Sequence, residues 1–335
     1  MEGKDNMEDP KQRIVTSIST ETLEKRWNAV RAFMKQEKID YLLARNDEEF
    51  LGGYVKWFTD IPARHSYPST VIFPVDDEMT MINCGPFPPA EGGPPPWAVR
   101  GVKQRIGAPY FPSVHYTSTY DAELAVGVLK QKKNATIGLV GKSYIPMNFF
   151  EYLSKNLPGA RFVDATEPID QMKVIKNPEE QELIRKTAAL QDKAMEYIWK
   201  RIKPGIHDYE IYADILYSTT MNGSERQLVL VSSGPQDQPV PFAPRHFQNR
   251  VVKEGDQISV LIEVNGPGGL YTELGRVFSV GKPSQELQDA WGAAVEAQKV
   301  SLSMLKPGAT PKDVWDANNA FLEKNGRLDW SGYGV

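Results

Sequence analysis

Two glutamates, Glu263 and Glu273, stand on either side of a glycine-rich turn in the segment LIEVNGPGGLYTELGRVF, residues 261–278. The apolar run before the turn predicts a buried strand, and the residues after it predict a second strand of the same hairpin. With residues 265–269 as the turn, Glu263 lies opposite Tyr271 and diagonal to Glu273, all on one face, which makes Tyr271 a candidate for substrate binding. Such a pair can hold a cationic group, and without a cation one carboxyl pKa rises. A solvated hairpin face is the alternative.

A histidine and two arginines accompany this hairpin. His246 lies in PFAPRHFQNR, just before the first hairpin strand, and a loop histidine can act as a general acid or base. Packing or plain exposure is the equal alternative. Arg245 can bind a substrate carboxylate through its planar guanidinium, although solvated arginines are commoner. Arg276 is also a candidate for substrate binding, but simple strand alternation places it on the face opposite Glu273.

A second dense cluster of chemically useful side chains occurs in GGYVKWFTDIPARHSYP, residues 52–68. Its candidates for substrate binding are Trp57, Arg64 and His65, because aromatic rings beside cationic groups suit a small polar ligand. Packing in a core or at an interface is the stronger alternative for these residues.

Length and composition limit the possible classes of protein. The chain has 335 residues, which predicts about two domains, and its net charge of -4 gives no basic surface for nucleic acid. The only cysteine, Cys84, cannot form an internal disulfide, and the four histidines mean that any metal site would rely on carboxylates. No apolar run approaches the roughly 20 residues of a membrane helix, and the N-terminus lacks the pattern of a signal peptide. A cytoplasmic protein with no membrane or nucleic-acid partner is therefore expected.

The first half of the chain alternates helix and strand patterns, which predicts a small α/β domain. Residues 1–15 are polar and expected to be flexible, and residues 16–166 form the predicted N-terminal domain. Its expected elements are a helix at 20–40, strands at 41–44, 69–77, 78–83 and 134–141, and a helix at 144–160. The proline-rich and glycine-rich segment 84–101 is expected to be a loop.

The second domain is predicted to span residues 167–335. Its first helix starts with Asn177 as N-cap and Pro178 at the first helical position. The other expected elements are helices at 207–223, 284–308 and 310–326, and strands at 226–234, 251–264 and 270–280. The phrase IKPGIHDYEIYADI recurs in outline as LKPGATPKDVWDAN, which predicts a duplicated α/β architecture.

Together, NPEEQELIRKTAALQDKAM, the two KPG junctions and RVVKEGDQISVLIEVNGPGGLYTELGRVF resemble the creatinase, prolidase and aminopeptidase P family. The pattern RWNAVRAFMKQEKIDYLLARNDEEFLGGYVKWFTD is similar to that family's creatinase-type N-domain. The resemblance covers about residues 20–330. It implies an α/β (α+β) protein with a small N-domain and a pita-bread catalytic-type domain. It further implies a homodimer in which the N-domain of one subunit borders the active site of the other.

The same resemblance raises the question of metal ions. Metal-dependent members of the family carry aspartates in both hairpin strands, followed by a histidine and two glutamates, as suits a hard divalent pair. This sequence has Glu273 at the second position, and Glu263 or Asn265 at the first. Creatinase, a member of this family that works without a metal, resembles this sequence at the second position. A site without metal or other cofactor is therefore expected, with a manganese or cobalt pair as the alternative.

After AFLEKNGR the sequence ends with LDWSGYGV, whereas the family continues with a His-Gly segment and further strands. A pita-bread domain that is incomplete at its C-terminal end is therefore expected. The leading interpretation is a hydrolase of a C–N bond in a small polar or peptide-like substrate, with His246, Glu263 and Glu273 as catalytic residues. The alternatives are a metal-dependent Xaa-Pro peptidase and a non-catalytic binding or assembly protein of the same fold.

Overall fold

The computed structural model describes residues 17–48, 53–63, 66–85 and 98–327. It contains two compact units. The first comprises the described residues up to 200 together with 212–229 and 261–275, and the second comprises 201–211, 230–260 and 276 onwards. In the described part of the chain, no helix is long and apolar enough to cross a membrane.

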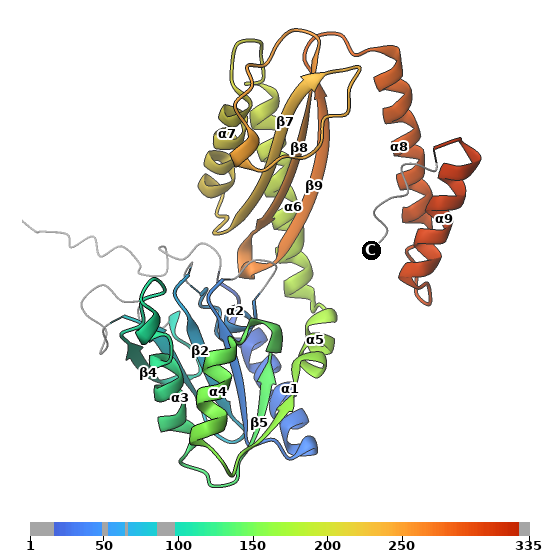
Figure 1. Cartoon of the computed structure of the whole chain (residues 1–335). Helices are drawn as coiled ribbons and strands as arrows, with labels where there is room; N and C mark the ends of the chain where they lie inside the picture. Colours follow the sequence, from blue (N-terminus) through green and yellow to red (C-terminus); the bar gives the residue numbers. More distant parts are fainter. Residues whose placement is uncertain (1–16, 49–52, 64–65, 86–97, 328–335) are drawn as a thin grey trace, which may run out of the picture. The chain divides into compact units, whose positions relative to one another are not determined.

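The first unit contains a six-stranded mixed sheet in the order β4-β3-β2-β1-β5-β6 (Figure 1). The pairs β1–β2 and β2–β3 are antiparallel, whereas β3–β4, β1–β5 and β5–β6 are parallel. The strands are β1 Tyr41–Asn46, β2 Ser69–Pro74, β3 Met79–Cys84, β4 Val102–Ala108, β5 Thr136–Val140 and β6 Arg161–Asp164.

Helices cover both faces of this sheet. One hydrophobic core joins the sheet to α1, α2 and α5 through side chains such as Trp27, Phe58 and Ile169. The other joins it to α3 and α4 through side chains such as Ala122 and Phe149. Burial on both faces explains why the central strands read as continuous apolar runs. These helices are α1 Thr20–Glu37, α2 Tyr54–Thr59, α3 Tyr120–Leu129, α4 Met147–Asn156 and α5 Thr166–Val174.

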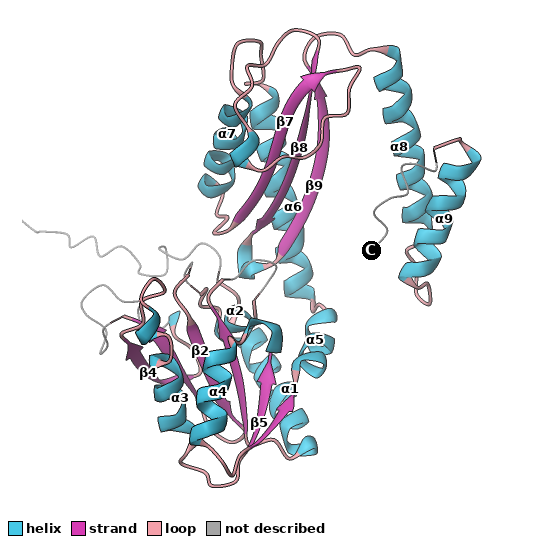
Figure 2. Cartoon of the chain, viewed as in Figure 1, coloured by secondary structure: helices cyan, strands magenta, loops and turns pink. Residues whose placement is uncertain are grey.

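The second half of the chain starts with the long helix α6 (Pro178–Trp199), and its predicted N-cap is confirmed. The Asn177 side chain accepts the backbone N–H of Glu180, whose carboxylate accepts the Asn177 N–H in return. The remaining elements are α7 Asp208–Met221, β7 Gln227–Pro235, β8 Asp256–Asn265, β9 Tyr271–Ser279, α8 Gln285–Met304 and α9 Pro311–Lys324. The strands form a sheet in the order β7-β8-β9 (Figure 2).

The two KPG junctions have the same local form. Gly205 and Gly308 both adopt left-handed backbone angles, with φ of 94° and 90°, where glycine is favoured. Each glycine is followed by a new helix, α7 in the first case and α9 in the second. The predicted pair of helix-loop-helix units is thus confirmed. Only the first pair is followed by strands among the described residues.

Every helix and strand predicted from the sequence is present, within a few residues at its ends. Among the α-helices and strands of the described residues, α2, β4, α3, β6 and α5 were not predicted. Most of the predicted loop 84–101 lies outside the described residues. The boundary predicted after residue 166 falls at the first residue of α5, and it stays a prediction.

Candidate functional site

The hairpin that carries the two glutamates differs in register from the prediction. Strand β8 ends at Asn265 and β9 begins at Tyr271, so the turn is 266–270, one residue later than expected. The backbone N–H of Gly266 donates to the carbonyl of Leu270 at 3.0 Å. This bond pairs Gly266 with Leu270. Three residues further along each strand of an antiparallel pair without a bulge, Glu263 lies opposite Glu273. In this register the predicted pairing of Glu263 with Tyr271 is wrong, and Glu263 directly opposes Glu273 instead of lying diagonal to it.

The two carboxylates have unequal surroundings. Glu263 is half-buried on β8, whereas Glu273 on β9 is exposed. Burial is the main cause that raises the pKa of Glu263, and the nearby Glu273 carboxylate raises it further. This electrostatic interaction is the one expected from the sequence. Like charges that directly oppose each other across a hairpin are destabilising, so the arrangement favours a bound cation or a proton.

Polar contacts from α6 fix the hairpin. The Gln191 side chain donates to the carbonyls of Ile262, at 2.7 Å, and Thr272, at 2.8 Å, which belong to the two different strands. The Thr272 hydroxyl donates back to Gln191 Oε1 at 2.8 Å. A Cβ at Gly266 would come within 2.2 Å of Thr187 Oγ1, so only glycine permits this close approach to α6. The glutamate pair is therefore carried on a backbone with little freedom.

Asn265, the alternative residue for the first hairpin position, has a structural function. Its Oδ1 accepts the backbone N–H groups of Glu225, at 2.9 Å, and Arg226, at 2.8 Å. It also accepts the hydroxyl of Ser224 at 3.2 Å, and the residue is buried. Because three donors already use this oxygen, Glu263 is the better candidate for binding at this position.

Replacing Glu263 with glutamine is expected to stabilise the protein near neutral pH. Because the pKa of Glu263 is raised in the folded state, its contribution to the free energy of unfolding is fully present below its ordinary unfolded pKa. That contribution is lost as the pH rises through the folded pKa. Removing the opposed charge should raise the free energy of unfolding at pH 8 by roughly 0.2–1 kcal/mol. Urea denaturation at pH 4 and pH 8 measures this, and the difference should vanish at pH 4.

The exposed Glu24 on α1 offers a matched control. Glu24→Gln should change the unfolding free energy little at either pH. If Glu263→Gln destabilises the protein at pH 8, the carboxylate makes a favourable contact and the repulsive pair is refuted.

His246 and Arg245 lie in the second compact unit, in the short helix η5 (Arg245–Phe247), and both are exposed. The His246 ring contacts the edge of Phe247, with ring centroids 5.0 Å apart. The Arg245 guanidinium lies over the Tyr209 ring at 4.8 Å and donates to the Gln248 carbonyl at 2.9 Å. The Arg245 guanidinium therefore already contacts neighbouring residues of its own segment and of α7. The catalytic role of His246 stays a prediction.

Arg276 is exposed on β9, and its role also stays a prediction. Arg250, in the same segment as His246, forms an ion pair with Asp256 through both terminal nitrogens. It also donates to the Ser233 hydroxyl at 3.2 Å. These contacts tie the end of the segment to β8, so Arg250 is a structural residue rather than a ligand for a substrate.

The structure brings together two residues predicted to bind substrate. Trp57 from α2 and Tyr271 from β9 line one cavity of about 190 Å³ in the first unit. Arg26 and Lys56 line the same cavity and were not predicted. Neither residue belongs to a recognisable motif, and both are far from the hairpin in the sequence. The sequence therefore gave no indication that they line this cavity. The predicted residues Arg64 and His65 lie outside the described part of the chain.

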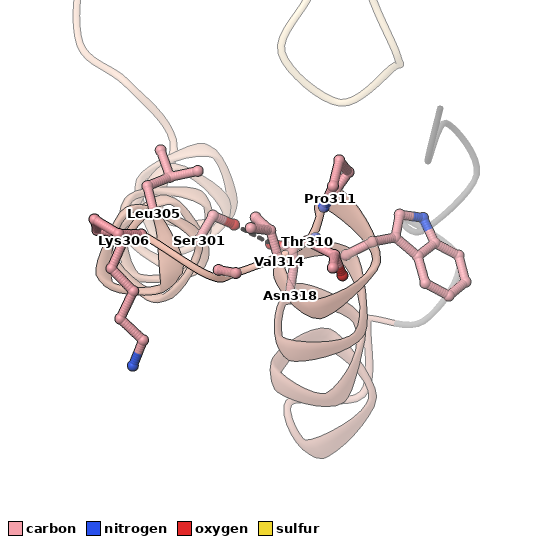
Figure 3. Close-up of a pocket in the computed structure, with 10 residues that line it drawn as sticks. Ser301, Leu305, Lys306, Thr310, Pro311, Val314 and Asn318 are labelled. Atoms are coloured by element: carbon pink, nitrogen blue, oxygen red, sulfur yellow. Dashed lines mark hydrogen bonds between the residues drawn. The ribbon is translucent and has the colours of Figure 1, made fainter.

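A second hollow lies between α8 and α9 and has a volume of about 690 Å³. In Figure 3, Ser301 and Asn318 point toward each other from the two helices, and their side chains form a hydrogen bond of 3.2 Å. Leu305, Val314 and Trp315 give this hollow a largely apolar lining, with Lys306 as its one charged residue. It contains no pair of titratable groups and is a weaker candidate for chemistry than the hairpin.

The two halves of the chain match two family profiles. Residues 95–175 match the Creatinase/Prolidase N-terminal domain, and residues 182–335 match Metallopeptidase family M24. The chain belongs to the creatinase, prolidase and aminopeptidase P family. Its fold is that of the family, with a creatinase-type N-domain followed by a pita-bread domain. The resemblance inferred from the sequence is thus confirmed.

Solved structures and curated proteins of this family resemble the chain at low identity. The prolidase from Pyrococcus horikoshii has a TM-score of 0.69 and 18% identity, covering 91% of this chain and 79% of that one. The X-Pro aminopeptidase from Thermotoga maritima has a TM-score of 0.70 and 20% identity, covering 90% and 78%. An uncharacterized hydrolase/peptidase, y4tL, from Sinorhizobium fredii is 29% identical over 215 residues, which are 62% of this chain and 53% of the relative. The chain spans about half the length of the curated relatives that it matches.

Membership of a metallopeptidase family implies a metal ion, so the donor set needs a test. Glu263 and Glu273 offer carboxylate oxygens, which hard divalent cations favour. In residues 17–48, 53–63, 66–85 and 98–327, no three His, Cys, Asp or Glu side chains are grouped so as to hold a metal. Catalytic metal sites use about three protein ligands or more. The described residues therefore do not fit a complete metal site.

Proposed function

We propose that this protein is a hydrolase of the creatinase and Xaa-Pro peptidase type that cleaves a C–N bond in a small polar or peptide-like substrate. The observation that carries the proposal is the opposed pair of Glu263 and Glu273 in the family's catalytic-type domain. Burial raises the pKa of Glu263 and repulsion from Glu273 raises it further, as expected where a protein keeps charges for binding rather than for stability.

In this proposal the pair holds a cationic group of the substrate, such as an ammonium or a guanidinium. A cation stabilises the ionised form of both carboxylates and therefore lowers the raised pKa of Glu263. By linkage, cation binding releases a proton from Glu263, so affinity strengthens as the pH rises through its pKa and weakens below it. Gln191 supports the pair by tying β8 to β9.

Proton transfer to the leaving nitrogen is assigned in the proposal to His246, as the sequence suggested. An exposed imidazole side chain can donate or accept that proton. The cleavage places a hydroxyl group of water on the carbon and a proton on the nitrogen, so it requires no oxidant or reductant.

A metal-dependent Xaa-Pro peptidase is the second candidate, because relatives in Pyrococcus horikoshii and Pyrococcus furiosus are named Xaa-Pro dipeptidases. Their identities of 26% and coverage of about half their lengths leave the substrate open. A binding or assembly protein of the same fold is the alternative without catalysis. The leading proposal differs from the metal-dependent peptidase in its metal-free site. It differs from the binding protein in its turnover of a small cationic substrate.

Metal content and turnover test the proposal together. The protein is dialysed with manganese or cobalt, freed of excess ion and analysed for metal, and Glu263→Ala and Glu273→Ala are treated in parallel. We expect near zero metal per chain and hydrolysis of one class in a panel of Xaa-Pro dipeptides and guanidino compounds. About two metal ions per chain, lost in both variants, would establish the metallopeptidase instead. Absence of turnover across the panel, with or without metal, would favour the binding protein.

A further inference from the structure

The cavity lined by Trp57 and Tyr271 lies wholly within the first compact unit, beside the tip of the hairpin. Its walls come from α1, α2, the junction of α5 with α6, and the residues that lead into β9. At about 190 Å³ it is smaller than the roughly 300–1,000 Å³ of pockets for drug-sized ligands. It therefore suits a small ligand.

Positive charge dominates the lining of this cavity. Among the described residues that line it, four side chains are cationic and one, Glu180, is a carboxylate. The four cations are Arg26, Lys56, Lys173 and Lys176. A small cavity with partly apolar walls strengthens the field of such charges, because water screens them less. An anion is the ligand that this lining favours.

Carboxylates outside the lining balance part of this charge. Lys56 Nζ lies 3.0 Å from Glu225 and 3.8 Å from Asp60, and Lys173 Nζ lies 3.8 Å from Asp170. Arg26 pairs with Glu180 at 2.6 Å. Lys176 donates its Nζ to the Lys173 carbonyl at 2.5 Å. The outer carboxylates hold Lys56 and Lys173 in place, and the Lys173 carbonyl holds Lys176, so the cationic lining is organised without a ligand.

One buried donor in this lining lacks an acceptor. The Arg26 side chain is only 9% exposed, and its terminal nitrogens donate to the Trp57 carbonyl and to Glu180. Its Nε, however, is buried with no hydrogen-bond partner among the described residues. A buried N–H of a charged group is costly when it has no acceptor, but this atom is closed off from solvent, so a ligand in the cavity contacts Arg26 through its other guanidinium atoms.

The rest of the lining fits a carbon skeleton. The Arg26 guanidinium lies 5.2 Å from the centroid of the Trp57 ring, and Ile184, Leu270 and Tyr271 add apolar surface. Gly268 and Gly269 bring backbone to the edge of the cavity, and a Cβ at Gly269 would come within 2.4 Å of the Lys56 side chain. The cavity thus combines charged donors with flat apolar walls.

We propose that this cavity is a binding site for a small organic oxyanion, a carboxylate or a phosphate ester with a few carbon atoms. The anionic oxygens bind Lys173, Lys176 and Arg26, and the carbon skeleton packs against Trp57 and Tyr271. Such a ligand bridges the hairpin tip and the helices α1, α2 and α6. The site is independent of the proposed hydrolysis, because neither Glu263 nor Glu273 lines it.

Calorimetric titration of the full chain with sodium benzoate and with sodium phosphate, at constant ionic strength, tests the site. We expect binding of at least one probe and a loss of about tenfold or more in affinity in Lys173→Gln and in Lys176→Gln. Lys186→Gln is the matched control, because it removes the same charge from the exposed surface of α6. Tighter benzoate indicates a carboxylate ligand, and tighter phosphate indicates a phosphate ester.

Hydrogen exchange on the wild-type chain gives a second measurement that needs no variant. The bound probe should slow exchange of the backbone N–H groups at 173–176 and 268–271. The proposal is overturned if neither probe binds, if the three lysine variants weaken binding equally, or if protection appears only elsewhere in the chain.

Discussion

Replacing Asp121 with asparagine is expected to lower the free energy of unfolding by about 3–5 kcal/mol, because it leaves a buried arginine without its counter-ion. Arg45 on β1 and Asp121 on α3 are 2% and 3% exposed, and Arg45 Nε lies 2.8 Å from Asp121 Oδ2. The rings of Tyr110 and Phe149 surround the guanidinium at 5.9 and 5.4 Å. Urea denaturation followed by circular dichroism measures the loss.

Two further variants make this prediction specific. Glu21→Gln breaks the exposed pair with Lys25 on α1 and should change the free energy of unfolding little. The double variant Arg45→Met with Asp121→Leu removes both charges and should recover most of the stability lost in Asp121→Asn. A cost below 1 kcal/mol for Asp121→Asn would mean that water or another group compensates the arginine charge.

The sequence predicted local structure well where local rules decide it. Helix α6 is an example, because Asn177, Pro178 and an apolar stripe define its start and its buried face without help from the rest of the chain. The strand β2 was equally clear as a short apolar run. The missed helices α2 and α5 have six and nine residues, too few for a periodic pattern to emerge.

The candidate site was predicted only in part, because register and long-range contacts decide it. The glutamate pair was found, but a shift of one residue in the turn changed a diagonal pair into an opposed one. Arg26 and Lys56 lie more than 200 positions before Tyr271, and only the tertiary fold brings these three residues to one cavity. The pairing of Arg45 with Asp121 spans 76 positions and leaves no local trace.

Replacing Glu273 with glutamine is expected to reduce kcat/KM for a cationic substrate by about 10- to 150-fold. A hydrogen bond to a charged group contributes about 1.5–3 kcal/mol, and each 1.36 kcal/mol changes a rate tenfold. The same change removes one of the two causes that raise the pKa of Glu263. The acid limb of the pH profile of kcat/KM should therefore move to lower pH in Glu273→Gln.

The shift in the pH profile separates a binding role from a loss of folding. Glu286→Gln on α8, where the carboxylate is exposed, should keep both the rate and the wild-type profile. Glu263→Gln should lower the rate and abolish the acid limb, because the titrating group itself is gone. If Glu273→Gln lowers the rate but leaves the acid limb in place, another group causes that limb and Glu263 is not coupled to the substrate. If neither glutamine variant changes kcat/KM, the pair is not the substrate site, and its repulsion is only a structural cost.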